Sequence, residues 1–244
     1  MLALSVQGLT YVRATTKGQL AEGFELRVDE FSVLAGSATG IVGPSGCGKS
    51  TLIDLFALLR RPTSAKQFEI QGQCIQTLWR SGGASACTAF RARHIGVVLQ
   101  TGGLLASLPV WDNVMLSQYL LGISDAKWSM RLLKTLGLDK LLERLPGQLS
   151  VGQRQRVAIA RALAHRPSLV FADEPTAALG VEHAPAAMAL LLELAKESGA
   201  GVVIVSHDKV LLSQYDIALA HCALTGDIMT FTPAARCDSF QPEK

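Results

Sequence analysis

The chain has 244 residues, of which 49% are hydrophobic and 18% are charged, with a formal net charge of +3. This length can bury a substantial core, and this composition excludes an intrinsically disordered chain. The mean hydropathy of +0.29 is high. A parallel sheet covered on both faces would explain it, and an apolar docking surface could add to it. The basic residues are dispersed, so charge alone argues neither for nor against nucleic acid.

The sequence contains no apolar run near the roughly 18 residues that a membrane-spanning helix needs. The first residues lack the charged and long apolar regions of a signal peptide, so the chain is expected to stay in the cytosol. Five cysteines lie at spacings that match no metal-binding pattern, and an odd number in a cytosolic chain predicts free thiols. They are Cys47, Cys74, Cys87, Cys222 and Cys237.

The secondary structure predicted from the sequence changes character near residue 38. Residues 2–34 alternate apolar and polar side chains, which predicts antiparallel strands. Residues 39–42 then predict a short buried strand, followed by a glycine-rich turn and a helix over 49–59 that ends at Arg61 and Pro62.

Further along, short apolar strands alternate with helices. Strands are predicted at 67–75 (a pair), 94–99, 169–172 and 201–205, and helices at 150–165 and 185–197. Residues 105–145 are predicted to be mostly helical, with breaks near 108–109, 122 and 137. The composition of residues 81–86 predicts a flexible loop. The alternation predicts an α/β fold with a mainly parallel sheet of right-handed crossovers and an N-terminal antiparallel β part. The helical segment has no strand of its own. We therefore expect a single domain over residues 1–244, with a sheet core at 1–104 and 166–235 and an inserted α-helical lobe at 105–165.

The glycine-rich turn carries the pattern of a phosphate-binding loop, with Gly43, Gly48, Lys49 and Ser50 at the required spacing. The glycines let backbone N–H groups surround a phosphate, and the following helix adds its positive dipole end. Lys49 can place its charge between the β- and γ-phosphates, and Ser50 can bind Mg²⁺. The predicted nucleotide-binding residues of this loop are Gly43, Pro44, Ser45, Gly46, Cys47, Gly48, Lys49, Ser50 and Thr51.

Cys47 lies inside this loop, beside Lys49 and the start of the helix. Both features favour the reactive thiolate form of a cysteine. The alternative is that Cys47 is only a small residue in a tight loop. In either case, alkylation of this thiol is predicted to block nucleotide binding unless ATP protects it.

A pair of carboxylates, Asp173 and Glu174, ends the predicted strand at 169–172. Ligands of open α/β sheets bind at this edge of the sheet. We therefore predict that Asp173 binds Mg²⁺, directly or through water, and that Glu174 is the general base for the attacking water. The pair could instead form a helix cap, an alternative that the phosphate-binding loop disfavours.

With these motifs, the sequence resembles the ATP-binding cassette (ABC) ATPases from about residue 4 to residue 231. Residues 149–153 and the helix after them resemble the family's signature motif, which ordinary phosphate-loop ATPases lack. Ser150 is a good helix N-cap, and Gly152 permits close backbone approach. The resemblance implies that Ser150, Gly152 and Gln153 contact the ATP held by a partner subunit.

The resemblance assigns roles to three more residues. Gln100 matches the glutamine that meets Mg²⁺ and the attacking water and links to the membrane partner, so it joins Ser50 and Asp173 as a metal ligand. His207 matches the histidine that contacts the γ-phosphate, and Tyr11 matches the aromatic that stacks on adenine, although it could equally be a strand aromatic. The other histidines, His94, His165, His183 and His221, match nothing and are expected to be structural.

The resemblance also implies an activity and partners. We expect an ATPase that uses ATP and Mg²⁺, pairs head to tail with a second ATPase subunit, most simply as a homodimer, and drives a transmembrane permease on a separate chain. It would lie on the inner face of the cell membrane, with no nucleic-acid partner. Residues 93–100 resemble the lipoprotein-release and macrolide-export branch. Alternatives are a non-transport ABC ATPase acting on DNA or ribosomes, and a nucleotide-gated module with weak hydrolysis.

Two positions depart from the family pattern. Val151 replaces the commonest signature glycine, so the backbone there must be one that a β-branched residue tolerates. Gly180 stands where the family usually has an aspartate that helps the two sites of the dimer communicate. We therefore expect slow or poorly coupled turnover.

Overall fold

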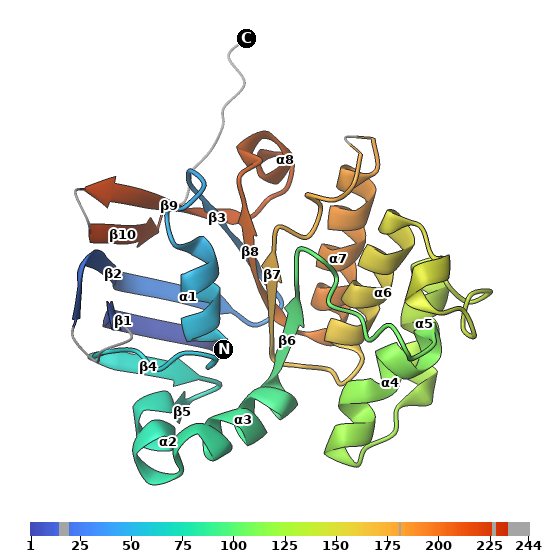
Figure 1. Ribbon diagram of the computed structural model, residues 1–244, viewed down its shortest axis with the longest axis horizontal. Helices are drawn as coiled ribbons and strands as arrows, with labels where there is room; N and C mark the ends of the chain where they lie inside the picture. The colour runs from blue at the N-terminus through green and yellow to red at the C-terminus, as the bar shows by residue number, and fades with distance from the viewer. Residues whose placement is uncertain (15–19, 181, 226–227, 234–244) are drawn as a thin grey trace.

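The computed structural model describes residues 1–14, 20–180, 182–225 and 228–233. It forms an α/β fold around one mixed ten-stranded sheet in the order β5-β4-β1-β2-β10-β9-β3-β8-β7-β6, which confirms the predicted fold class (Figure 1). The strands are β1 (Leu2–Ala14), β2 (Leu20–Leu34), β3 (Ala38–Val42), β4 (Gln67–Ile70), β5 (Gln73–Cys74), β6 (Ile95–Val98), β7 (Leu169–Asp173), β8 (Gly201–Ser206), β9 (Ala218–Thr225) and β10 (Ile228–Pro233). The helices are α1 (Lys49–Phe56), α2 (Ile75–Ser81), α3 (Gly83–His94), α4 (Val110–Leu121), α5 (Ala126–Thr135), α6 (Val151–Leu163), α7 (Ala184–Ser198) and α8 (Lys209–Ser213).

The sheet changes from antiparallel to parallel along its width. At one end β1 pairs antiparallel with β2 and with β4, as residues 2–34 predict. At the other end β3, β8, β7 and β6 run parallel. The carboxyl ends of these four strands therefore meet at one edge, where α/β proteins bind ligands.

The sheet curls around α1, so this helix is enclosed on several sides (Figure 1). Phe56 at its end is fully buried and packs against Phe31 of β2, Phe68 of β4 and Phe171 of β7, at ring-centroid distances of 5.2, 6.1 and 6.3 Å. Aromatic side chains contribute the largest buried areas of a core. The two parts of the sheet and the helix after the phosphate-binding loop therefore share one core.

The parallel strands are covered on both faces. In β7, Leu169 and Phe171 face the core around α1, whereas Val170 and Ala172 face a second core that includes α6 and α7. Because successive side chains of a strand point to opposite faces, such a strand must be apolar throughout. This arrangement accounts for much of the high mean hydropathy.

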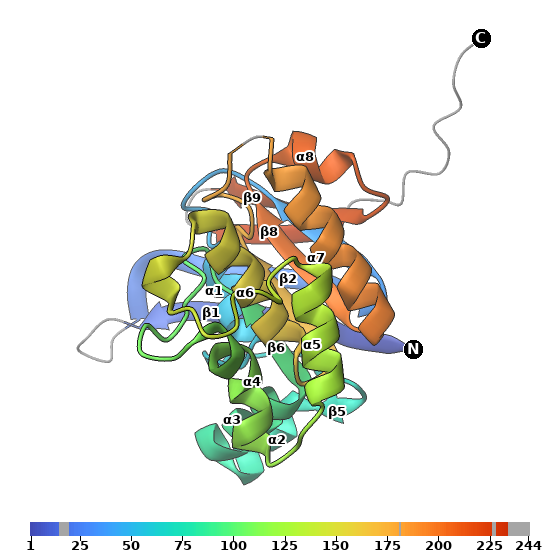
Figure 2. The ribbon, with the colours of Figure 1, turned by 90° about the vertical axis from the view of Figure 1, so that its right-hand side faces the viewer.

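Helices α4, α5 and α6 pack together on the outer side of the parallel strands and beside α7 (Figure 2). Trp128 of α5 is buried and donates its indole N–H to the carbonyl of Leu163 at 3.0 Å. Gln118 of α4 is also buried and bonds to Ser129 at 2.9 Å. The helical segment is thus fixed by buried hydrogen bonds as well as by apolar contacts. Its proposed bounds of 105–165 stay a prediction.

The structure corrects the predicted flexible loop at 81–86. Helix α2 runs to Ser81 and α3 begins at Gly83, so only Gly82 separates them. Ala84 and Ala86, which follow the two glycines, favour a helix, and Cys87 is buried against the core. Tertiary packing therefore outweighs the two glycines.

Two other predicted boundaries change. Helix α1 ends at Phe56 rather than at 59, because Leu58 adopts a left-handed conformation with φ 58° and the N–H of Leu59 turns back to the carbonyl of Asp54 at 2.8 Å. Strands β9 and β10 were not predicted individually, and they join β3 to β2 across the sheet. Throughout the described ranges, no helix is both long enough and apolar enough to cross a bilayer.

Candidate functional site

A cavity of about 810 Å³ lies at the carboxyl ends of β3, β6, β7 and β8. Thirteen residues line it, and most of them are predicted site residues. They are Tyr11, Arg13, Ser45, Gly46, Gly48, Lys49, Ser50, Thr51, Arg60, Gln100, Asp173, Glu174 and His207. The fold thus brings together segments that lie far apart in the sequence.

The phosphate-binding loop wraps around the amine of Lys49. Gly46 and Gly48 have φ values of 79° and 80°, which L side chains rarely adopt. Lys49 is only 7% exposed, and its Nζ donates to the carbonyls of Gly43 and Pro44 at 2.8 Å each. A buried ammonium needs such partners. It is therefore held at the mouth of the loop, ready to exchange these carbonyls for phosphate oxygens.

Asp173 lies at the end of β7, beside the start of α1. Burial raises the pKa of its carboxyl, while a hydrogen bond with the Ser50 side chain and the charge of Lys49 act in the opposite direction. Hydroxyl, carboxylate and amide oxygens are the ligands that Mg²⁺ prefers. The cavity places Ser50, Asp173 and Gln100 together, so this donor set fits a hard divalent cation.

Glu174 and His207 form a close pair across the cavity. His207 Nδ1 lies 2.9 Å from Glu174 Oε1, and the same oxygen accepts the backbone N–H of His207 at 3.0 Å. Glu174 has φ 48°, although it is not a glycine, while its N–H bonds to Val205 at 2.9 Å. Such backbone strain is costly and persists at sites where the surrounding structure holds it. The strain here aims the carboxylate at the cavity.

Two basic residues of this cavity, Arg13 and Arg60, are not among the residues predicted from the sequence. Arg13 lies two residues after Tyr11 on β1, and Arg60 follows α1. Arg60 forms an ion pair with Asp54 at 2.8 Å, and its Nη1 lies 3.5 Å from the Tyr11 hydroxyl. The i, i+2 spacing of Tyr11 and Arg13 in a strand could have indicated a shared face. No comparable local signal marks Arg60.

The segment after Gln100 is pinned from two sides. Arg161 of α6 donates to the carbonyls of Gly102 and Gly103 at 2.9 and 2.7 Å. The buried side chain of Asn113 binds both the N–H and the C=O of Leu105, at 2.8 and 3.0 Å. The position of Gln100 is therefore coupled to α4 and α6 through hydrogen bonds.

The signature residues lie outside this cavity. Ser150 caps α6 by accepting the N–H of Gln153 at 3.2 Å, and Gln153 accepts the N–H of Ser150 at 2.8 Å, so the predicted N-cap is confirmed. Val151 is the first residue of α6, so its backbone is helical, a conformation that a β-branched side chain tolerates. Its side chain is 44% exposed. Ser150, Val151 and Gly152 line a separate pocket of about 470 Å³ with Gly180 and His183.

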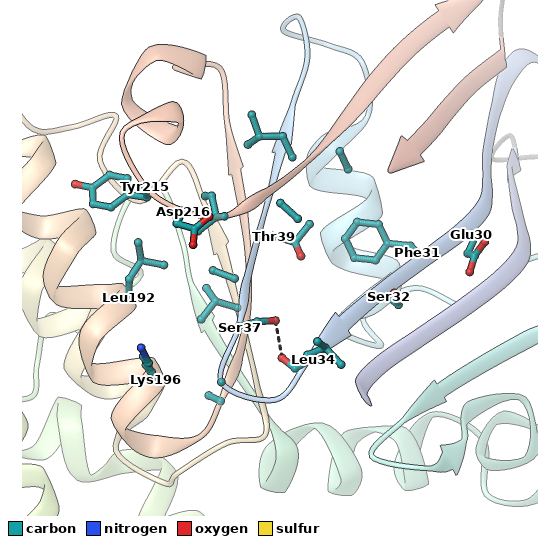
Figure 3. A pocket seen from close by; sticks show the side chains of 18 residues that line it. Glu30, Phe31, Ser32, Leu34, Ser37, Thr39, Leu192, Lys196, Tyr215 and Asp216 are labelled. Atoms are coloured by element: carbon teal, nitrogen blue, oxygen red, sulfur yellow. Dashed lines mark hydrogen bonds between the residues drawn. The ribbon is translucent and has the colours of Figure 1, made fainter. Parts of the chain in front are cut away.

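A third hollow of about 840 Å³ lies at the opposite end of β3, between β2 and α7 (Figure 3). Its lining includes Phe31, Lys196 and Asp216, and Ser37 donates to the carbonyl of Leu34 at 2.9 Å at its rim. It contains none of the predicted site residues. The phosphate-loop cavity is therefore the candidate site.

The remaining histidines and cysteines were expected to be structural or free. His94 stacks on Phe90 with ring centroids 4.4 Å apart, and His165 is buried. Four cysteines carry free thiols, namely Cys47, Cys74, Cys87 and Cys222, as predicted. Cys237 lies outside the described residues.

Comparison with known proteins identifies the family of this chain. The profile of the ABC transporter family matches residues 26–177. The chain belongs to this family. It is 40% identical over 219 residues to the lipoprotein-releasing system ATP-binding protein LolD of Gluconobacter oxydans, covering 88% of this chain and 90% of that protein. It is also 38% identical over 200 residues to the methionine import ATP-binding protein MetN of Cupriavidus metallidurans, covering 81% of this chain and 56% of MetN.

A solved structure agrees in fold. The dimeric, post-hydrolysis ATP-binding cassette MJ0796 bound to ADP and Pi superposes with a TM-score of 0.73 at 29% identity, covering 92% of this chain and 94% of that one. The chain is therefore an ATP-binding cassette with the ATPase activity of its family.

Proposed function

We propose that this cassette hydrolyses Mg²⁺-bound ATP in the phosphate-loop cavity and thereby powers a membrane transporter of the lipoprotein-release type. The observation that carries the proposal is the convergence of Lys49, Asp173, Glu174 and His207 on one cavity. The 40% identity to LolD over most of both chains supports the choice of transport class.

The phosphate loop and the amine of Lys49 would bind the phosphates. Lys49 is already buried, and its Nζ donates to two neutral carbonyls, so a phosphate oxygen would offer it a stronger, charge-assisted bond. Arg13 and Arg60 add positive charge to the cavity wall. Tyr11 lies on the same wall and offers its ring to the adenine.

Ser50, Asp173 and Gln100 would hold Mg²⁺, which would neutralise charge on the phosphates. Burial opposes ionisation of Asp173, and a cation beside it would reverse that effect. In the described ranges, no group of three or more His, Cys, Asp or Glu side chains is placed so that it could hold a metal ion. A hydroxyl, an amide and one carboxylate with remaining positions for water suit Mg²⁺, which retains several waters.

Glu174 would take a proton from the attacking water, and His207 would orient it. A base must lie within hydrogen-bond reach of its proton, and both groups face the cavity from the ends of β7 and β8. In the structure the Glu174 carboxylate is bound to His207 at 2.9 Å. Substrate binding would loosen this pair, because His207 would turn towards the γ-phosphate.

Completion of the site would require a second copy. Ser150, Gly152 and Gln153 do not line the cavity of their own chain, and Ser150 and Gly152 face a different pocket. We infer a head-to-tail homodimer in which the N-terminus of α6 covers the partner's nucleotide. The dimeric MJ0796 cassette supports this arrangement. A permease on a separate chain would receive the motion near Gln100.

The first test is ATP-dependent dimerisation of the Glu174→Gln variant by size-exclusion chromatography. Without its base this variant should bind ATP but not release phosphate, so a dimer should form with ATP and dissociate without it. Glu193→Gln, a matched change of an exposed carboxylate on α7, should hydrolyse ATP like the wild type. A Glu174→Gln variant that hydrolyses ATP at the wild-type rate would remove Glu174 from its proposed role.

The transport class needs a cellular test. Depletion of the chain should leave lipoproteins in the inner membrane while methionine uptake stays normal. Normal lipoprotein release with impaired methionine uptake would instead favour a role like that of MetN.

A further inference from the structure

Two cysteines meet behind the phosphate-binding loop. Cys47 is in the loop and Cys222 is in β9, and they are 175 positions apart in the sequence. The register pairs Val42 with His221, so Cys222 follows at the point where β3 gives way to the loop. The Cys222 thiol donates to the carbonyl of Cys47 at 3.0 Å.

Gly43 shows how tightly the two side chains are packed. A Cβ added at Gly43 would lie 2.9 Å from Cys47 Sγ and 2.8 Å from Cys222 Cβ, closer than real Cβ contacts allow. Both cysteines therefore pack against Gly43. They are 2% and 7% exposed, respectively. A disulfide requires the two sulfurs to meet, and the Cys222 sulfur already lies 3.0 Å from the carbonyl oxygen of Cys47.

The two thiols have different surroundings. Lys49 Nζ lies 3.8 Å from Cys47 Sγ, whereas the Cys222 thiol is held in its hydrogen bond to the Cys47 carbonyl. Burial and the neighbouring Cys47 raise the pKa of the Cys222 thiol. Cys47 is therefore the sulfur that reacts first with an oxidant, and Cys222 is the partner that follows.

We propose that Cys47 and Cys222 are a redox modification site, at which a hydroperoxide links the phosphate-binding loop to β9 by a reversible disulfide. The inference rests on the proposed function, because its consequence is a loss of ATP binding. In the first step the Cys47 sulfur attacks the O–O bond of hydrogen peroxide, giving a sulfenic acid and one water. In the second step the Cys222 sulfur attacks the Cys47 sulfur, the S–O bond breaks, and the released hydroxide takes the Cys222 proton as a second water. Two electrons pass from the thiols to the peroxide.

The disulfide would hold the loop from behind. ATP binding requires the N–H groups of residues 44–48 to close around phosphate, and a bond from Cys47 to β9 restricts that movement. Linkage also requires the converse, so bound ATP should slow oxidation. We expect the oxidised protein to bind ATP at least tenfold more weakly than the reduced protein.

The test treats the reduced, full-length chain with hydrogen peroxide and then blocks the remaining thiols. Mass spectrometry of non-reduced peptides should find the Cys47–Cys222 link, and titration with a fluorescent ATP analogue should show the lost affinity. Dithiothreitol should remove the link and restore binding. Preincubation with Mg²⁺-ATP should reduce the yield of the link.

Two variants control the test. Cys222→Ser should bind the ATP analogue and should keep its affinity after brief peroxide treatment, so that dithiothreitol restores nothing. Cys222→Ala serves as a second form of this variant in case the first folds poorly. Cys87→Ala removes another buried thiol, in α3, and should behave like the wild type. A wild-type protein that forms no linked peptide, or that forms it and keeps its ATP affinity, would overturn the inference. A reduced protein that does not bind ATP would instead refute the proposed function, while the link could still be measured.

Discussion

Protonation of His165 should destabilise the fold below neutral pH. The ring lies just after α6, is 8% exposed, and neither ring nitrogen has a hydrogen-bond partner among the described residues. Burial lowers its pKa from 6.5 to about 4, with a smaller contribution from His94, although the nearby backbone of Ile95 favours the charged form. Charging this ring would place an ion between α6 and β6, the two elements that position Ser150 and Gln100.

The size of the effect follows from the two pKa values. Because the folded-state pKa is lower than the unfolded one, the unfolded chain binds more protons between about pH 6.5 and 4, and stability falls as the pH falls through this window. At about 1.4 kcal/mol per pH unit the full effect is about 3 kcal/mol, of which about 2 kcal/mol is lost by pH 5. Above pH 7 the histidine has no effect of this kind.

Urea unfolding at pH 7.5 and pH 5.0 measures this loss. The wild type should lose about 2 kcal/mol more than the His165→Leu variant over that interval. His221→Gln, which changes an exposed ring on β9, should keep the wild-type pH dependence. An identical loss in wild type and His165→Leu would show that the buried ring is protonated in the native state without cost, and the reasoning would be wrong.

Three further predictions concern the site. Gly180→Asp should raise the ATPase rate about fivefold if the missing carboxylate limits coupling between the two sites. A Cβ at Gly180 meets no atom within 4 Å, so the substitution creates no steric clash at this atom. An unchanged ATPase rate would therefore refute the hypothesis that Gly180 slows turnover. Alkylation of Cys47 should abolish binding of a fluorescent ATP analogue, with protection by ATP, and unchanged binding after complete modification, verified by mass spectrometry, would contradict this. Arg60→Ala should raise the KM for ATP about threefold with little change in kcat, because Arg60 contacts the Tyr11 hydroxyl while it is ion-paired with Asp54 at an exposed position. A fall in kcat with no change in KM would count against a role of Arg60 in adenine binding.

Features encoded within a few consecutive residues could be predicted from the sequence. The glycines and Lys49 of the phosphate-binding loop, the acidic pair after β7 and the Ser150 cap each depend on backbone geometry and on side chains a few positions apart. Hydrophobic alternation likewise predicted β1 and β2, and short continuous apolar runs predicted the buried parallel strands, because a strand covered on both faces must be apolar. These predictions needed no knowledge of what packs against the segment.

The tertiary structure decided the rest, because contacts between distant segments depend on packing. The glycines at 82 and 83 gave no sign that burial of Cys87 would favour a helix around them. The 2.9 Å approach of His207 to Glu174 depends on the adjacent ends of β7 and β8, and Arg60 reaches Tyr11 only because α1 lies inside the curled sheet. Likewise, no local pattern connects Cys222 with Cys47. Local sequence determined which chemical groups are present, and the three-dimensional packing of the sheet around α1 determined which of them meet.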